Sequence, residues 1–279
     1  MDSNNQNQIL ALLLLIIMIL SVLCLLGGIT LGIIKLAVPT PEVETESDTS
    51  EESSSEEDTA TSVTPQGMML PDTSDAGTEY IDKMIFFGES TTAHLRSRGV
   101  LSGGTDTHQV WTDSSGTRML SSRITSEPIV YPPTGEKLTV AEACQKEKPA
   151  YLVLSFGLNG ITNFISNKDQ YVSNYGRLIA AIQAASPDTK IILQTVYPVC
   201  KANNYSVDVE TLNGYIATLN SWLPEIAAKY ENVRVADTAS VLLDSNDKLN
   251  SSYDNGDGIH LTTAAYEQIL DYLRTHAWQ

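Results

Sequence analysis

Apolar residues are distributed along this chain in two different ways. From Ile9 to Ile34 the chain is almost continuously apolar and carries no charged residue. This run is longer than the roughly 20 residues that a helix needs to cross a bilayer. A cleavable signal peptide usually has an apolar region of only about 7–15 residues followed by a small-x-small site, and no such site follows here. We therefore expect a short tail, residues 1–8, and then one uncleaved transmembrane anchor, residues 9–35.

Beyond residue 80 the apolar residues occur in short runs that are separated by longer segments of mixed character. Five runs are typical of buried strands: Lys83–Phe87, His108–Trp111, Ala150–Phe156, Lys190–Pro198 and Val233–Asp237. These runs are continuously apolar rather than alternating, which favours strands that are covered on both faces, as in a parallel sheet.

The segments between these runs have the spacing of helices. Thr139 precedes Glu142 by three residues, which predicts a capping box for a helix over 139–148. Longer helical patterns cover 171–186, 209–230 and 262–276, with a kink expected before Pro224. Residues 112–135 are rich in Ser, Thr, Gly and Pro, and we expect loops there with a short hairpin around 131–135.

Alternating strands and helices predict an α/β fold, a three-layer sandwich with helices on both faces of a central, mostly parallel sheet. The sheet and its helices account for residues 80–279, which are enough for one well-filled core. This domain would follow the single N-terminal transmembrane helix.

The charge of the chain is concentrated in one segment before this domain. The formal net charge is −17, and nine acidic residues lie between Glu42 and Asp58 among Ser, Thr and Pro. Such a composition cannot bury enough apolar area to fold, so we expect residues 36–79 to be an extended, disordered tether. The domain itself is only mildly acidic, so we expect no nucleic-acid partner. We expect a cell-membrane protein whose domain lies outside the cytoplasm.

Two cysteines, Cys144 and Cys200, fall in the domain. They are too few for a disulfide framework or a metal site, and either one pair or two separate thiols is compatible with the sequence. We expect no metal and no organic cofactor.

Ser90 is the first residue with a candidate chemical role. The strand-like run 83–87 enters Gly88-Glu89-Ser90, and a helix is expected to start there. Ligands of α/β folds bind outside the carboxyl ends of strands. The free N–H groups and the positive dipole end of a helix also suit a developing oxyanion. Serine is a common helix N-cap, so a purely structural role is the alternative.

Two further positions carry polar groups suited to the same reaction. Asp257 and His260 are three residues apart, a spacing that lets a carboxylate orient an imidazole. A calcium loop lacks its regular ligand spacing here, and a plain turn is the remaining alternative. Asn159 follows the strand-like run 150–156, where its amide can donate to an oxyanion or only occupy a turn.

Taken together, the three stretches are similar to the sequence blocks of the GDSL-like esterases, or SGNH hydrolases. Gly88–Ser90 stands where the family carries Gly-Asp-Ser, Gly157–Gly160 matches its Gly-x-Asn-Asp block, and Asp257–His260 matches its Asp-x-x-His block. The resemblance covers residues 80–279. It implies an SGNH, flavodoxin-like sandwich.

The resemblance also implies roles for these residues. Ser90 would be the nucleophile, His260 the general base and then acid, and Asp257 the residue that orients His260. The backbone N–H of Ser90 and the side chain of Asn159 would form the oxyanion hole, with a glycine N–H as a third donor. Gly116 is our candidate for that glycine.

Several departures and alternatives stay open at this point. Gly104 is the second candidate for the glycine donor. Glu89 replaces the family's Asp, and Gly160 replaces the acid after Asn159. The order Ser, Asp, His also occurs in α/β-hydrolases, but their Gly-x-Ser-x-Gly elbow would need a glycine where Thr92 stands. His94, one turn after Ser90, is an alternative base.

The function implied is that of a membrane-tethered, extracytoplasmic serine esterase that hydrolyses short acyl esters. O-acetyl groups on cell-wall or other glycans are the first expectation for the substrate, because of the tether and because family members deacetylate polysaccharides. Lipid or thioester substrates are the alternative. A catalytically inactive surface module that binds glycan is the alternative from a different class.

Overall fold

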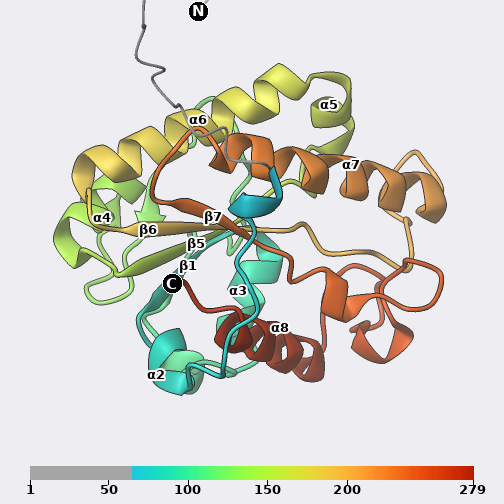
Figure 1. Ribbon diagram of the computed structural model, residues 1–279, viewed down its shortest axis with the longest axis horizontal. Coiled ribbons are helices and arrows are strands. Elements are labelled where there is room, and N and C mark those ends of the chain that lie inside the picture. Colours follow the sequence, from blue (N-terminus) through green and yellow to red (C-terminus); the bar gives the residue numbers. More distant parts are fainter. Residues whose placement is uncertain (1–64) are drawn as a thin grey trace, which may run out of the picture. The chain divides into compact units, whose positions relative to one another are not determined.

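The computed structural model describes residues 65–279 (Figure 1). The predicted tail, the predicted anchor and the acidic part of the predicted tether lie outside the described residues. Within residues 65–279, no helix combines the length and the apolar character that a membrane crossing requires.

A five-stranded parallel sheet forms the centre of the domain, in the order β2-β1-β5-β6-β7. The strands are β1 (Met84–Gly88), β2 (Val110–Trp111), β5 (Tyr151–Ser155), β6 (Lys190–Gln194) and β7 (Val233–Ala236). Each strand overlaps one of the five predicted apolar runs, so the predicted parallel sheet is confirmed. Because β2 lies on one side of β1, and β5, β6 and β7 lie on the other, the strand order reverses between β1 and β5. Such a switch point is where open α/β sheets bind ligands.

Helices cover both faces of the sheet (Figure 1). On one face lie α4 (Val140–Glu147), α6 (Lys168–Ala185) and α7 (Val209–Ala227), with the short α5 (Ile161–Ser166) beside α7. On the other face lie α2 (Thr78–Ile81), α3 (Ser90–Ser97) and α8 (Thr263–Thr275).

The strand β1 shows how the two apolar cores arise from one sequence run. Ile85 and Phe87 are buried in the core beneath α4, α6 and α7, whereas Met84 and Phe86 are buried in the core beneath α3 and α8. Successive side chains of a strand point to opposite faces. A continuously apolar run is therefore what a strand between two helical layers requires, and the predicted three-layer sandwich is confirmed.

The local predictions for helices and turns have mixed outcomes. The capping box of Thr139 and Glu142 is present at the start of α4. The predicted hairpin is formed by β3 (Ile129–Val130) and β4 (Lys137–Leu138), which pair antiparallel. Helix α7 continues through Pro224 to Ala227. The hydrogen bond that this proline cannot donate falls in the last turn of the helix, where its loss affects few residues.

The sequence placed one domain boundary too late. The predicted tether extended to residue 79, but Met68 and Leu70 are buried in the domain. The N–H of Leu70 donates to the Val235 carbonyl at 2.8 Å, and the N–H of Thr73 donates to the Thr275 carbonyl at 2.7 Å. The folded part therefore begins near residue 68. The composition of this stretch hides it, because its few apolar residues lie among polar ones.

Candidate active site

The turn between β1 and α3 depends on Gly88. A Cβ atom at this position would collide with the carbonyl oxygen of Ser155 in β5 and with the hydroxyl of Thr92. Only glycine therefore lets β1 approach β5 closely and turn at once into α3. Ser90 is the first residue of α3, where no intrahelical carbonyl is available to its N–H.

The structure brings Ser90, His260 and Asp257 into one chain of hydrogen bonds. Ser90 Oγ lies 2.9 Å from His260 Nε2, across a separation of 170 residues. His260 Nδ1 lies 2.7 Å from Asp257 Oδ2. The other carboxylate oxygen of Asp257 accepts from the backbone N–H of His260 at 2.8 Å. An imidazole held in this way has its Nε2 lone pair directed at the hydroxyl.

Hydrogen bonds keep Asp257 ionised. Partial burial acts to raise the pKa of Asp257, but the backbone N–H and the ring of His260 and the N–H of Ile259 outweigh it and lower the pKa to about 2. The carboxylate is therefore charged at every pH at which the domain is expected to be folded.

A second carboxylate holds the loop that carries Asp257. Asp254 accepts the backbone N–H groups of Gly256 at 2.8 Å and Gly258 at 2.7 Å. Lys201 Nζ lies 3.1 Å from Asp254 and also donates to the Gly256 carbonyl at 2.6 Å. Gly258 has a φ of +87°, and a side chain there would collide with Lys201. These contacts fix the loop before His260.

Glu89 holds the turn that carries Asn159. Its side chain is 4% exposed, and Oε1 accepts the N–H groups of Gly157 at 2.9 Å and Asn159 at 3.1 Å. The side-chain amide of Asn159 donates to Thr117 Oγ1 at 3.2 Å. Because Glu89 precedes Ser90 directly, one residue links the serine turn to the asparagine turn. Sequence reasoning recorded Glu89 only as a departure and did not find Thr117.

The two candidate glycines differ in position. Gly116 lies against Ala93 of α3, directly before Thr117, so it is close to Ser90 and Asn159. However, its N–H donates to the Asp113 carbonyl at 3.1 Å, so it is not free for an oxyanion in this conformation. Gly104 follows the far end of α3, and its N–H donates to the Leu101 carbonyl at 2.9 Å. The structure therefore does not bring Gly104 to the site.

His94 packs against the ring of His260, with 4.6 Å between the ring centroids. Burial, then the neighbouring His260 and Arg98, lower the pKa of His94. Ser90 Oγ bonds to His260 rather than to His94. The geometry favours His260 over His94 as the base.

A hollow of 560 Å³ opens beside Asn159. Most of its lining residues are polar, and Met119, at 50% exposure, is its large apolar side chain. Around Met119 lie Asp113, Ser115, Thr117, Arg118, Glu127, Asn159 and Gly160. The hollow has room for part of a small substrate next to the amide of Asn159.

The thiols lie outside this arrangement. Within the described residues, Cys144 is buried, Cys200 is half-buried and both are free.

Glu89 gives a prediction about stability. Burial, opposed by the three backbone N–H groups of the asparagine turn, raises the pKa of Glu89 to about 8. Between about pH 4.5 and 8 the unfolded chain loses this proton and the folded chain keeps it. The free energy of unfolding should therefore fall as the pH rises, by up to about 1.4 kcal/mol per pH unit. Urea denaturation at pH 5, 6.5 and 8 should show this slope in the wild type and a weaker slope in Glu89→Gln. Parallel slopes would contradict it.

Comparisons with known proteins identify one family. Residues 86–268 match the model of a family described as GDSL-like lipase/acylhydrolase. No curated protein sequence matches the chain.

Three solved structures similar to the chain have sequence identities below 20%. A Streptococcus pneumonia protein whose name refers to platelet activating factor is 18% identical, with a TM-score of 0.49, over 69% of this chain and 82% of its own. A carbohydrate esterase of family 3 from Talaromyces cellulolyticus is 15% identical, with a TM-score of 0.45, over 68% and 93%. A GDSL-like lipase from Bacteroides thetaiotaomicron is 19% identical, with a TM-score of 0.45, over 75% and 90%.

Proposed function

Because the chain belongs to the GDSL-like lipase/acylhydrolase family, we propose that it is a serine esterase that hydrolyses short acyl esters. The observation that carries this proposal is the contact of 2.9 Å between Ser90 Oγ and His260 Nε2, with Asp257 on the other ring nitrogen. It lies at the switch point between β1 and β5, where ligands of this sheet type bind.

The first half of the reaction transfers the acyl group to the serine. Ser90 Oγ attacks the ester carbonyl carbon while His260 Nε2 takes the hydroxyl proton. Asp257 stabilises the imidazolium that forms. The carbonyl oxygen becomes an oxyanion, which the N–H of Ser90 and the amide of Asn159 stabilise. When the intermediate collapses, the bond to the alcohol oxygen breaks and His260 gives its proton to that oxygen.

Water completes the cycle. His260 takes a proton from a water molecule, the hydroxide attacks the acyl carbon, and the same donors stabilise the second oxyanion. The bond to Ser90 Oγ then breaks, the serine recovers its proton from His260, and a carboxylic acid leaves. The amide of Asn159 has two N–H groups, of which one donates to Thr117 Oγ1 at 3.2 Å and the other is left for the oxyanion in each half.

The substrate we propose is an O-acetyl ester of a glycan on the cell wall or elsewhere outside the cytoplasm. Two observations support this substrate. The hollow beside Asn159 offers the polar side chains of Asp113, Ser115 and Thr117 to the hydroxyl groups of a glycan. The apolar run from Ile9 to Ile34 supports a single-pass membrane location for the full chain.

Fluorophosphonate labelling tests the proposal directly, because only an activated serine reacts readily with this probe. The wild-type chain should label at Ser90, as located by peptide mass spectrometry, and should release acetate from an O-acetylated glycan. The exposed hydroxyl of Ser97, at the other end of α3, is the internal control and should stay unlabelled. Absence of labelling would favour a non-catalytic glycan-binding module, and labelling with turnover of long-chain esters alone would favour a lipase.

A further inference from the structure

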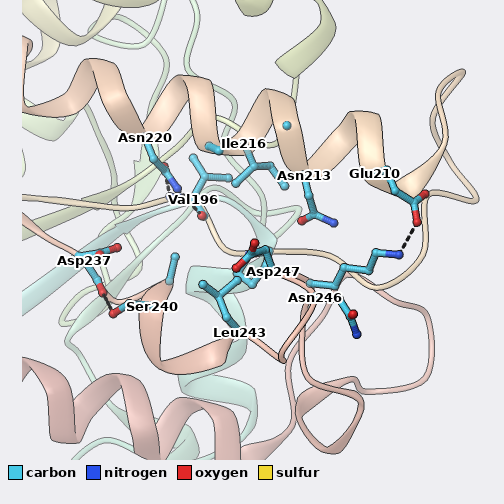
Figure 2. Close-up of a pocket in the computed structure, with 15 residues that line it drawn as sticks. Val196, Glu210, Asn213, Ile216, Asn220, Asp237, Ser240, Leu243, Asn246 and Asp247 are labelled. Atoms are coloured by element: carbon cyan, nitrogen blue, oxygen red, sulfur yellow. Dashed lines mark hydrogen bonds and ion pairs between the residues drawn. The ribbon is translucent and has the colours of Figure 1, made fainter.

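A second cavity, of 490 Å³, lies away from Ser90, Asp257 and His260, none of which lines it (Figure 2). One wall is the first half of α7, the facing wall is the segment 237–248, and Val196 and Pro198 close the back. Its volume is within the range of about 300–1,000 Å³ that is usual for sites of small organic ligands.

The position of this cavity relates it to the candidate active site. Val196 follows β6 and Asp237 follows β7, so the cavity lies at the same carboxyl edge of the sheet as Ser90 and Asn159. Val196 is also the neighbour of Gly157, since a Cβ on that glycine would lie 2.8 Å from Val196 Cγ2. A long ligand that follows this edge of the sheet would meet both sites.

Gly214 keeps the cavity open. It lies inside α7, where glycine is less favourable than alanine by about 1 kcal/mol. Unlike Gly88, it is not required by a close contact, because a Cβ there would meet no atom within 4 Å. Gly176, the glycine inside α6, differs, since its Cβ would lie 3.0 Å from the Tyr230 hydroxyl. The space in front of Gly214 is therefore not filled by a neighbouring side chain.

The charges of the cavity favour a cation. Its lining includes three carboxylates and one amine. Glu210 is paired with Lys248, as the dashed line in Figure 2 shows. Within the described part of the chain, Asp237 and Asp247 have no basic partner at salt-bridge distance. Asp237 is more than half buried, and burial raises its pKa despite a hydrogen bond of 3.3 Å with the Thr195 hydroxyl. A buried carboxylate without a cation is costly, so a bound cation would be stabilised here.

The remaining surface favours an organic cation with hydroxyl groups over a metal ion. Among residues 67–279, no group of three or more potential ligand side chains is close enough to hold a metal. Leu243, which is 39% exposed, offers apolar surface, and Asn246 and Ser240 offer polar atoms at the rim. The amides of Asn213 and Asn220 are already bonded to the backbone of Val199 and Val196.

We propose that this cavity binds an amino-sugar unit, with its ammonium group attracted by the carboxylates of Asp237 and Asp247 and its apolar ring face against Leu243. On a glycan that carries both free amines and acyl esters, this site would hold one unit while Ser90 acts on another. The joint action of this cavity and Ser90 on one glycan rests on the proposed function, but the binding of the amino sugar does not.

Calorimetric titration of the full-length wild-type chain with a tetramer of β-1,4-linked glucosamine tests the site. This probe carries no ester, so esterase activity plays no part in the result. The N-acetylated tetramer, which has the same size but no cation, should bind at least tenfold more weakly. Equal binding of the two tetramers, or no binding of the glucosamine tetramer, would overturn the proposal and leave the esterase proposal untouched.

Three variants locate the binding. Gly214→Leu should weaken the glucosamine tetramer at least tenfold, because the side chain enters the cavity while the helix gains propensity. Asp247→Asn should weaken it at least threefold at low salt, and the fold should be kept because asparagine accepts the φ of +57° at this position. Ser221→Leu places the same side chain on α7 outside the cavity and should stay within twofold. Unchanged binding in Gly214→Leu would overturn the placement.

Discussion

Ser90→Ala is expected to reduce kcat for a short acyl ester by at least about 10⁴-fold while leaving the domain folded. The hydroxyl is the atom that forms the acyl-enzyme, so no other group at the site can replace it. Ser90 is only half-buried, and its one side-chain hydrogen bond is the contact of 2.9 Å with His260. Loss of a single half-buried bond of this kind costs about 1 kcal/mol of stability.

Initial rates with p-nitrophenyl acetate and thermal unfolding of the same preparations measure both parts of this prediction. Ser97→Ala is the matched control, because Ser97 ends the same helix and its hydroxyl bonds only to the His94 carbonyl, at 3.3 Å. The control should keep wild-type activity. A Ser90→Ala protein that retains a tenth of the activity would rule out the covalent mechanism, whatever the unfolding curve shows.

The fold was predictable because its signals are local. Each strand is a continuous apolar run and each long helix a periodic one, so a parallel sheet between two helical layers follows without knowledge of the contacts. The errors occur where distant side chains decide the backbone. The run Lys190–Pro198 reads as one strand, but β6 ends at Gln194. Beyond β6, the side chain of Asn220 replaces a neighbouring strand. Its Oδ1 accepts the Val196 N–H at 2.7 Å, and its Nδ2 donates to the Val196 carbonyl at 3.0 Å.

The site was predictable only in part, for the same reason. The sequence placed Ser90 and Asn159 directly after strands and His260 three residues after Asp257, and the structure brings Ser90 and His260 into contact and joins the turn of Asn159 to Glu89. The roles of their supports were not predictable. Glu89 acts through the turn after β5, 68 positions further along the chain, and no spacing rule connects the two. The cavity facing Gly214 likewise depends on how segment 237–248 packs on α7, and the sequence pattern of neither segment predicts that packing.

Asp257→Asn should lower kcat by about 10⁴-fold, the second largest effect expected, although the substituted atom does not touch the substrate. In the wild type, Asp257 Oδ2 accepts from His260 Nδ1 at 2.7 Å, which leaves the Nε2 lone pair for the serine proton. An asparagine amide in that place would donate to Nδ1 and move the ring proton to Nε2, so the base would face Ser90 with its lone pair occupied.

Asp254→Asn is the control that separates this tautomer effect from damage to the loop. Asp254 and Asp257 lie on the same loop, and each accepts two backbone N–H groups, which an asparagine oxygen can still accept. Only Asp257 bonds to the imidazole, so Asp254→Asn should lose less than tenfold, through its weakened contact with Lys201. If the two variants lose activity equally, loop order rather than the state of His260 limits the reaction. Because the pKa of Asp257 is about 2, the wild-type carboxylate stays charged throughout an assay between pH 5 and 9, and the comparison holds across that range.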